Sequence, residues 1–229
     1  MTVPIRGISS MATRQLLAEL TATWQQRTGD VVSIEAVGGV DAARRVQGGE
    51  AFDVVILASD AIDRLMAGGR VLAGSRVDLV RSGVAVCVRA GASRPDISTE
   101  EALRRAVLAA RSIGYSTGPS GVALMKLFER WGIATEVLQR SVQAPPGIPV
   151  GAQVARGEVA LGFQQLSELM SLDGISVIGL LPAAVQITTI FSAGLCPASS
   201  QTDAVRRMLA FMASPETIAI KRRHGMDAA

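Results

Sequence analysis

The sequence predicts an α/β fold of two lobes, in which each lobe is a mostly parallel sheet flanked by helices and the chain crosses between the lobes twice. Short apolar strands alternate with amphipathic helices, which is typical of an open parallel sheet. Near the middle of the chain two strands follow each other with no helix between them, which indicates passage into a second sheet. The expected first lobe comprises residues 1–80 and 194–229, and the second comprises residues 81–193 of the 229.

The first lobe begins with three strand–helix pairs. Short runs rich in Val and Ile predict strands at residues 3–8, 31–36 and 53–57. Apolar residues at helical spacing predict helices at residues 11–28, 41–46 and 61–66. Because such sheets bind ligands beyond the carboxyl ends of their strands, the residues after each strand are candidates for a site.

The crossings are predicted from the strands at residues 77–80 and 84–89, whose link at 81–83 is too short for a helix, and from a β-rich return segment at 186–193. Ser98 and Glu101 predict a capping box for a helix ending at Ala110. The remaining elements are a strand ending at Tyr115, helices at 121–131 and 150–155, a loop at 145–149, a strand at 159–164, and two final helices starting at Thr202 and Ser214.

Composition excludes several classes of function. The net charge is +3, but the arginines are scattered and aromatic residues make up only 3%, so we expect no nucleic-acid partner. The apolar runs are far shorter than the roughly 20 residues of a membrane-spanning helix, so we expect no membrane insertion. Cys87 and Cys196 are isolated and lack metal-ligand spacing, which predicts two buried thiols, or a disulfide if the protein is exported. We expect no metal site and no cofactor.

The amino-terminal residues lack the cationic start, apolar run and cleavage site of a secretory signal. We therefore expect a cytoplasmic location for the chain as written, and a periplasmic one if a leader has been removed.

Two turns rich in hydroxyl groups predict an anion site. Ser9 and Ser10 stand where the first strand becomes a helix, and the segment 116–121, with Thr117 and Ser120, repeats this arrangement. Unpaired N–H groups at helix starts and neighbouring hydroxyls suit a small oxyanion or carboxylate. Each turn could instead be an ordinary helix cap.

Five further residues are candidate ligand contacts, each with a structural alternative. Gly39 and Ser59 follow predicted strands, but Gly39 can serve backbone geometry and Ser59 can simply start a helix. Arg81 lies in the crossing and suits a carboxylate, or it holds the hinge. Gln164 and Gln165 supply amide groups, although neighbours on one strand cannot both face the same side.

The sequence resembles the molybdate- and sulfate-type solute-binding proteins, which have a two-lobed periplasmic-binding fold. The resemblance covers nearly the whole chain. It is carried by Ser9-Ser10, Ala43-Arg44 with Gly48 and Asp53, Ala58-Ser59-Asp60, Arg156-Gly157-Glu158 to Gly162 with Ser167-Glu168, and two segments of the ending, 211–216 and 223–226.

The resemblance implies a ligand site that this chain keeps in part. Ser10 matches the oxyanion-binding serine of the family. The second serine of the family falls at Gly39 or Val40, and its tyrosine falls at Gln165. Losing a hydroxyl donor costs roughly 1–3 kcal/mol. The replacements therefore favour a larger planar carboxylate over a tightly held molybdate.

Two functions follow from the resemblance. One is a solute-binding protein for a molybdate-like oxyanion or a di- or tricarboxylate, with an ABC permease as partner if the protein is exported. The alternative is an enzyme like the aconitate isomerases, which look like relatives of molybdate-binding proteins and interconvert trans- and cis-aconitate by a proton shift. The catalytic base is not assigned, and its candidates by position are Tyr115, Glu35, Asp41 and Glu168. A third possibility, the ligand domain of a DNA-binding regulator, would need a helix-turn-helix motif that the sequence lacks.

Overall fold

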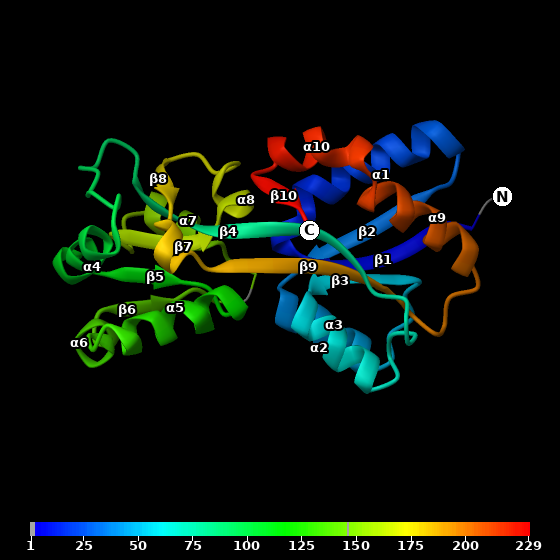
Figure 1. The fold of residues 1–229 in the computed structure, drawn as a ribbon, viewed down its shortest axis with the longest axis horizontal. Helices are drawn as coiled ribbons and strands as arrows, with labels where there is room; N and C mark the ends of the chain where they lie inside the picture. Colours follow the sequence, from blue (N-terminus) through cyan, green and yellow to red (C-terminus); the bar gives the residue numbers. More distant parts are fainter. Residues whose placement is uncertain (1–2, 146) are drawn as a thin grey trace. The chain divides into compact units, whose positions relative to one another are not determined.

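The computed structural model describes residues 3–145 and 147–229, and the chain divides into two compact units (Figure 1). Unit 1 comprises Met1–Ser82 and Ile190–Ala229, and unit 2 comprises Gly83–Thr189. Two strands, β4 (Val77–Arg89) and β9 (Thr188–Leu195), contribute residues to both units. The loop predicted at 145–149 includes Pro146, which lies outside the described residues.

Unit 1 is built on a sheet whose first three strands are parallel, as predicted. Strand β1 (Ile5–Ser10) pairs with β2 (Val32–Val37) on one side and β3 (Val54–Ala58) on the other. The expectation of a mostly parallel sheet is wrong farther along, because β9 pairs antiparallel with β3 and the carboxyl-terminal β10 (Met226–Ala228) pairs antiparallel with β4.

Helices cover both faces of this sheet (Figure 1). One core contains Leu16, Leu20 and Trp24, which lie at helical spacing in the first long helix, together with apolar residues near the carboxyl terminus. The second core contains Val46 and Ile62 from two shorter helices. The helical elements of unit 1 are η1 (Met11–Thr13), α1 (Arg14–Thr28), α2 (Gly39–Gln47), α3 (Ser59–Ala67), α9 (Thr202–Ala213), η3 (Pro215–Thr217) and α10 (Ile218–Arg223).

Unit 2 has a mixed sheet with its own two cores. Strand β5 (Ile113–Tyr115) pairs in parallel with β6 (Ser141–Gln143) and β7 (Leu161–Gln165). Strand β4 pairs antiparallel with β7 and with β8 (Ile175–Leu180). Its helical elements are α4 (Glu100–Ala109), α5 (Pro119–Arg130), α6 (Ala134–Leu138), α7 (Val150–Ala155), α8 (Leu166–Leu169) and η2 (Ala183–Val185).

Two local predictions are wrong, and a third is correct except in the first turn of the helix. The two strands predicted around residues 81–83 form the single strand β4, because Arg81 and Ser82 remain extended and pair with β10. The cap of α4 is Thr99, whose side chain accepts a hydrogen bond from Ala102 N, while Ser98 N donates to Asp96 Oδ1. The first helix begins as the 3₁₀ turn η1 and becomes α-helical only at Arg14.

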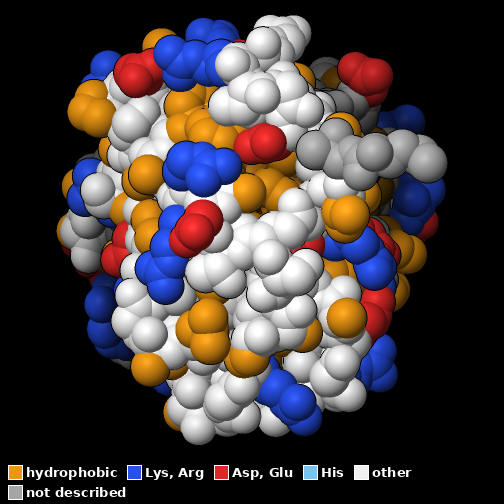
Figure 2. All heavy atoms as spheres, turned by 90° about the vertical axis from the view of Figure 1, so that its right-hand side faces the viewer, with side chains coloured by type: hydrophobic (Ala, Val, Ile, Leu, Met, Phe, Trp, Pro, Cys, Tyr) orange, Lys and Arg blue, Asp and Glu red, His pale blue; other side chains and the backbone are white. Residues whose placement is uncertain are grey.

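The surface carries charged side chains of both signs. Figure 2 shows basic and acidic side chains interspersed on the face that it presents. Exposed ion pairs such as Arg27–Glu216 and Arg76–Asp63, both at 2.8 Å, contribute to this pattern.

Within the described residues, no helix has the length and apolar character required to cross a membrane. Cys87 and Cys196 are buried free thiols, as predicted.

Candidate functional site

In unit 1, predicted ligand residues gather where β1 and β3 end. The two strands are parallel, so Ser10 at the end of β1 and Ser59 after β3 belong to the same edge of the sheet. Gly39 begins α2 on this edge, and a Cβ atom built on it would lie 3.5 Å from Ser10 Cβ. The fold therefore brings Ser10 and Gly39 into contact distance, although they are far apart in the sequence.

Ser9 and Ser10 have different environments. The hydroxyl of Ser9 is buried and donates to the carbonyl of Glu35 at 3.4 Å. Ser10 occupies the cap position of η1 but its side chain makes no capping hydrogen bond. Its Oγ is buried and has no partner among the described residues. Because buried polar atoms in proteins are nearly always paired, a ligand is a natural partner for Ser10.

The positions of Ser59 and Arg81 give both residues a structural role. Ser59 is the half-buried first residue of α3, so it also serves the start of that helix. Arg81 is exposed, and its Nε donates to the carbonyl of Ala228 at 3.0 Å. This contact ties the carboxyl-terminal strand to β4.

In unit 2, the second hydroxyl turn joins β5 to α5. The Oγ atoms of Ser116 and Ser120 lie 3.1 Å apart, and half-buried Thr117 stands between them in the sequence. A Cβ on Gly121 would lie 1.9 Å from the carbonyl oxygen of Ser116, so only glycine allows this close turn. The predicted cluster of Thr117 and Ser120 thus forms a tightly constrained turn at the start of a 12-residue helix.

The two glutamines occupy opposite sides of β7, as the alternation of side chains predicts. Gln164 accepts from Gly151 N at 3.2 Å and donates to Glu168 Oε1 at 2.9 Å. Gln165 donates to Thr189 Oγ1 at 2.8 Å, and its Oε1 is buried without a partner among the residues described. The free acceptor of Gln165 can receive a ligand hydroxyl or a protonated carboxyl.

The four candidate bases differ in their surroundings. Glu35 forms an exposed ion pair with Arg45 at 2.8 Å, and the hydrogen bonds of that guanidinium lower its pKa. Asp41 pairs with Arg44 at 2.8 Å. Tyr115 is half-buried against the apolar core of unit 2.

Glu168 is the exception, because burial raises its pKa from 4.5 to about 7, and its hydrogen bond from Gln164 offsets only part of this effect. A carboxyl group that titrates near neutral pH can both accept and return a proton under physiological conditions.

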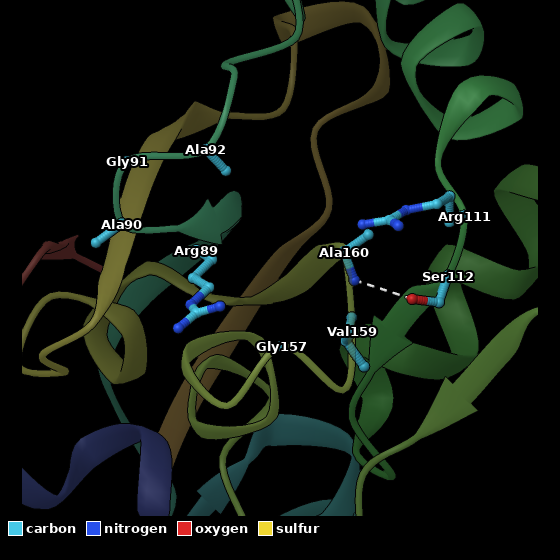
Figure 3. A pocket seen from close by; sticks show the side chains of 9 residues that line it. All are labelled: Arg89, Ala90, Gly91, Ala92, Arg111, Ser112, Gly157, Val159 and Ala160. Carbon is cyan, nitrogen blue, oxygen red and sulfur yellow. Dashed lines mark hydrogen bonds between the residues drawn. The ribbon is translucent and has the colours of Figure 1, made fainter.

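A pocket of about 640 Å³ lies elsewhere in unit 2 (Figure 3). It is lined by Arg89 at the end of β4 and by Arg111 and Ser112 just before β5. Ser112 Oγ accepts from Ala160 N at 2.9 Å, just before β7. The pocket therefore sits at the amino ends of β5 and β7, the opposite edge from Glu168, and includes none of the predicted ligand residues.

The sequence interpretation missed two polar residues of unit 1. Lys221 of α10 is buried with 1% of its surface exposed, and Ser82 of β4 is equally buried with an unpaired Oγ. Lys221 begins a run of basic residues at 221–224, and such runs at helix ends are usually solvated. Lys221 follows the buried Thr217, the last residue of η3, by four residues.

The two-unit α/β fold, with helix starts and hydroxyl groups at the carboxyl ends of its strands, defines the class of solute-binding proteins. Residues 5–227 match the family described as bacterial extracellular solute-binding protein, and the chain belongs to this family.

Its similarity to individual proteins is of two kinds. The chain is 37% identical over 215 residues to an aconitate isomerase from a Pseudomonas species, covering 91% of this chain and 82% of that one. Among solved structures, it is similar to the periplasmic molybdate-binding protein of Azotobacter vinelandii, with a TM-score of 0.80, 20% identity, and 97% and 98% of the two chains covered. It also resembles the substrate-binding domain of a putative molybdenum ABC transporter from Clostridium difficile, with a TM-score of 0.76, 15% identity and full coverage of both chains. The two structural similarities support the fold alone.

Proposed function

We propose that this protein binds a small tricarboxylate and isomerises it as an aconitate isomerase does, by moving a proton between two carbon atoms. The 37% identity to an aconitate isomerase over 91% of the chain carries this proposal. Glu168 provides the chemical support, since it is the one of the four candidate bases whose pKa of about 7 suits reversible proton transfer.

In this proposal, each unit carries side chains suited to binding carboxylates. Unit 1 contributes the free hydroxyl of Ser10, and unit 2 contributes the turn with Thr117 and Ser120 and the amide N–H groups of Gln165, one of which donates to Thr189. Hydroxyl and amide donors suit carboxylate oxygens, and several are needed for three carboxylates.

The reaction requires one proton carrier and no oxidant. The carboxylate of Glu168 takes a proton from the methylene carbon of the substrate, and the electron pair of that C–H bond forms a new double bond to the central carbon. The former double bond opens, and its terminal carbon takes the proton back from Glu168. Gln164 holds the Glu168 carboxyl through its 2.9 Å hydrogen bond and is itself fixed by Gly151 N. Gln164 is therefore a positioning residue in this scheme.

The alternative is a binding protein for a tetrahedral oxyanion such as molybdate. The unpaired hydroxyl of Ser10 favours it, because this residue matches the oxyanion-binding serine of the molybdate-type proteins. If a leader is removed and the protein is exported, we propose an ABC permease as its partner and the periplasm as its location.

A thermal-shift comparison separates the two functions. Molybdate, tungstate and sulfate are tested against cis-aconitate, trans-aconitate, citrate and tricarballylate at one protein concentration. A ligand at 100 times its dissociation constant adds about 2.7 kcal/mol, enough to raise the melting temperature by several degrees. We expect the tricarboxylates to stabilise the protein. Stabilisation by the metal oxyanions alone would contradict the isomerase and support oxyanion capture.

A further inference from the structure

The pocket of unit 2 at the amino ends of β5 and β7 is lined by two arginines and no acidic residue (Figure 3). Arg89 is the last residue of β4, and Arg111 stands two residues before β5. Both are exposed, and neither guanidinium forms an ion pair or a hydrogen bond with a residue in 3–145 or 147–229. The cavity of about 640 Å³ has the size of a small-molecule site. Its charge suits an anion.

The strand order brings the two arginines to one edge of the sheet. Strand β7 pairs antiparallel with β4 and parallel with β5, so the end of β4 and the starts of β7 and β5 meet there. Because neighbouring strands lie about 4.8 Å apart, the backbones at Arg89 and Arg111 are separated by roughly 10 Å. Figure 3 shows Gly157, Val159 and Ala160 between them. The two guanidinium groups therefore flank the segment that leads into β7.

Small residues leave room between the arginines. A Cβ built on Gly157 would lie 3.7 Å from Arg89 Nη1, which places the Arg89 guanidinium beside this glycine. Gly157 has a φ of 76°, a conformation that other residues rarely adopt, and Ala160 carries only a methyl group. A ligand resting on this segment can reach a guanidinium on each side.

The acidic residues near the pocket do not neutralise the arginines. Glu158 follows Gly157 but forms its ion pair with Arg156. Asp173 is exposed and precedes Gly174, whose carbonyl accepts a hydrogen bond from Ala90 N at 2.9 Å. Asp173 forms no ion pair within the described part of the chain. The lining of the pocket therefore keeps an excess of positive charge.

Ser112 supplies a third donor to the pocket. Its Oγ accepts from Ala160 N at 2.9 Å, so its own proton remains available to a ligand oxygen. The exposure of the arginines favours phosphate over carboxylate. A carboxylate brings one charge to an exposed guanidinium and gains little there. A phosphate group brings nearly two charges and three acceptor oxygens, which match the fork of an arginine and leave an oxygen for a hydroxyl.

We propose that this pocket is a second anion site, which binds a small molecule carrying two linked phosphate groups. One phosphate pairs with Arg89 and the other with Arg111, and Ser112 donates to a phosphate oxygen. The site lies at the opposite edge of the sheet from Glu168, so this inference goes beyond the proposed function and does not depend on it.

The test measures binding of pyrophosphate and of inorganic phosphate by calorimetry, in a metal-free buffer of constant ionic strength. The variants are Arg89→Gln and Arg111→Gln. The matched control is Arg94→Gln, which removes the same charge from an exposed arginine that follows the pocket loop without lining the cavity.

We expect the wild-type protein to bind pyrophosphate at concentrations up to about 1 mM, and to bind inorganic phosphate more weakly because one phosphate group cannot pair with both arginines. Each pocket variant should lose about tenfold in affinity for pyrophosphate, since one bidentate pair is removed. Arg94→Gln should bind like the wild-type protein. The melting temperature of each ligand-free variant should stay unchanged, because the replaced side chains are exposed.

Two results would overturn the proposal. One is a wild-type protein that does not bind pyrophosphate in this range. The other is an equal loss of affinity in Arg94→Gln, which would show a general effect of charge. Tricarballylate serves as the second probe, and all variants should bind it as the wild-type protein does, whereas its loss in the pocket variants would contradict a separate site. A wild-type protein that binds pyrophosphate but no tricarboxylate would refute the proposed function and leave the second site supported.

Discussion

The two units differ in the polar side chains near the carboxyl ends of their strands. In unit 1, the hydroxyls of Ser10 and Ser82 are buried and lack partners among the described residues. In unit 2, Gln164 connects Gly151 to Glu168, and Ser116 contacts Ser120. Unpaired donors are suited to holding an anion, while an acid held by its neighbours is suited to moving a proton. Under the proposed function, Ser10 of unit 1 serves binding, while unit 2 supplies the proton carrier Glu168 together with further binding groups.

The largest expected effect tests the role of unit 2. Glu168→Gln keeps the shape of the side chain and removes its ability to take a proton. We expect kcat for aconitate isomerisation to fall by about 10²–10⁴-fold, the usual contribution of a general base. Steady-state kinetics measure the loss, and tricarballylate binding serves as the control that should stay near the wild-type value. A variant with wild-type kcat would show that another residue carries the proton.

The next effect tests the role of unit 1. Ser10→Ala removes a hydroxyl that makes no capping bond, so the free energy of unfolding should change by less than about 0.5 kcal/mol. Ligand affinity should fall about tenfold to a hundredfold, because one ligand oxygen loses its donor. Calorimetry with tricarballylate and denaturant unfolding measure the two quantities. Lower stability with unchanged affinity would make Ser10 a structural residue.

The pH dependence of stability tests the raised pKa of Glu168 without measuring activity. Its pKa is about 7 in the folded protein and 4.5 ordinarily, so the folded state holds the extra proton between these values. Stability should therefore fall as pH rises through this window. Between about pH 5 and pH 8 the wild-type protein should lose roughly 1–3 kcal/mol relative to Glu168→Gln. If the difference in unfolding free energy between the wild-type protein and Glu168→Gln does not change across this pH range, the reason for choosing Glu168 as the base is removed.

The smallest effect concerns ligand choice. A Cβ at Gly39 meets only Ser10 Cβ, at an ordinary 3.5 Å, so Gly39→Ser fits and adds a hydroxyl beside Ser10. We expect molybdate to bind up to about tenfold more tightly, in line with one added hydrogen bond. Arg89→Ala, in the pocket at the opposite edge of unit 2, should leave binding of both ligands unchanged. Molybdate affinity that does not respond to Gly39→Ser would show that the position does not face the ligand.

The sequence predicted most elements because their apolar periodicity is strong. Helix α7 has the predicted bounds, and the three parallel strands of unit 1 were expected from their alternation with helices. The short elements α6, β6, β8 and β10 were missed, because three to six residues carry too little periodicity to stand out. The continuity of β4 was missed because Arg81, Ser82 and Gly83 look like a turn, and only pairing with β10 keeps the first two extended.

Site residues were predictable where a motif places them at a strand end. Ser10 and Gly39 were selected separately from local patterns, but their proximity depends on how α2 packs beside β1. The environment of Glu168 depends on burial and on Gln164, which sequence alone does not give. Lys221 was missed because a basic run at a helix end is usually solvated, and here the packing of α10 against α1 and β10 buries one of its members.

The most direct test of the central claim follows trans-aconitate in deuterated water by proton NMR with the wild-type protein and Glu168→Gln. The account predicts that the wild-type protein produces cis-aconitate until the two isomers reach equilibrium, and that Glu168→Gln produces it at least about a hundredfold more slowly. Trans-aconitate that stays unchanged with the wild-type protein would contradict the isomerase and leave a binding protein.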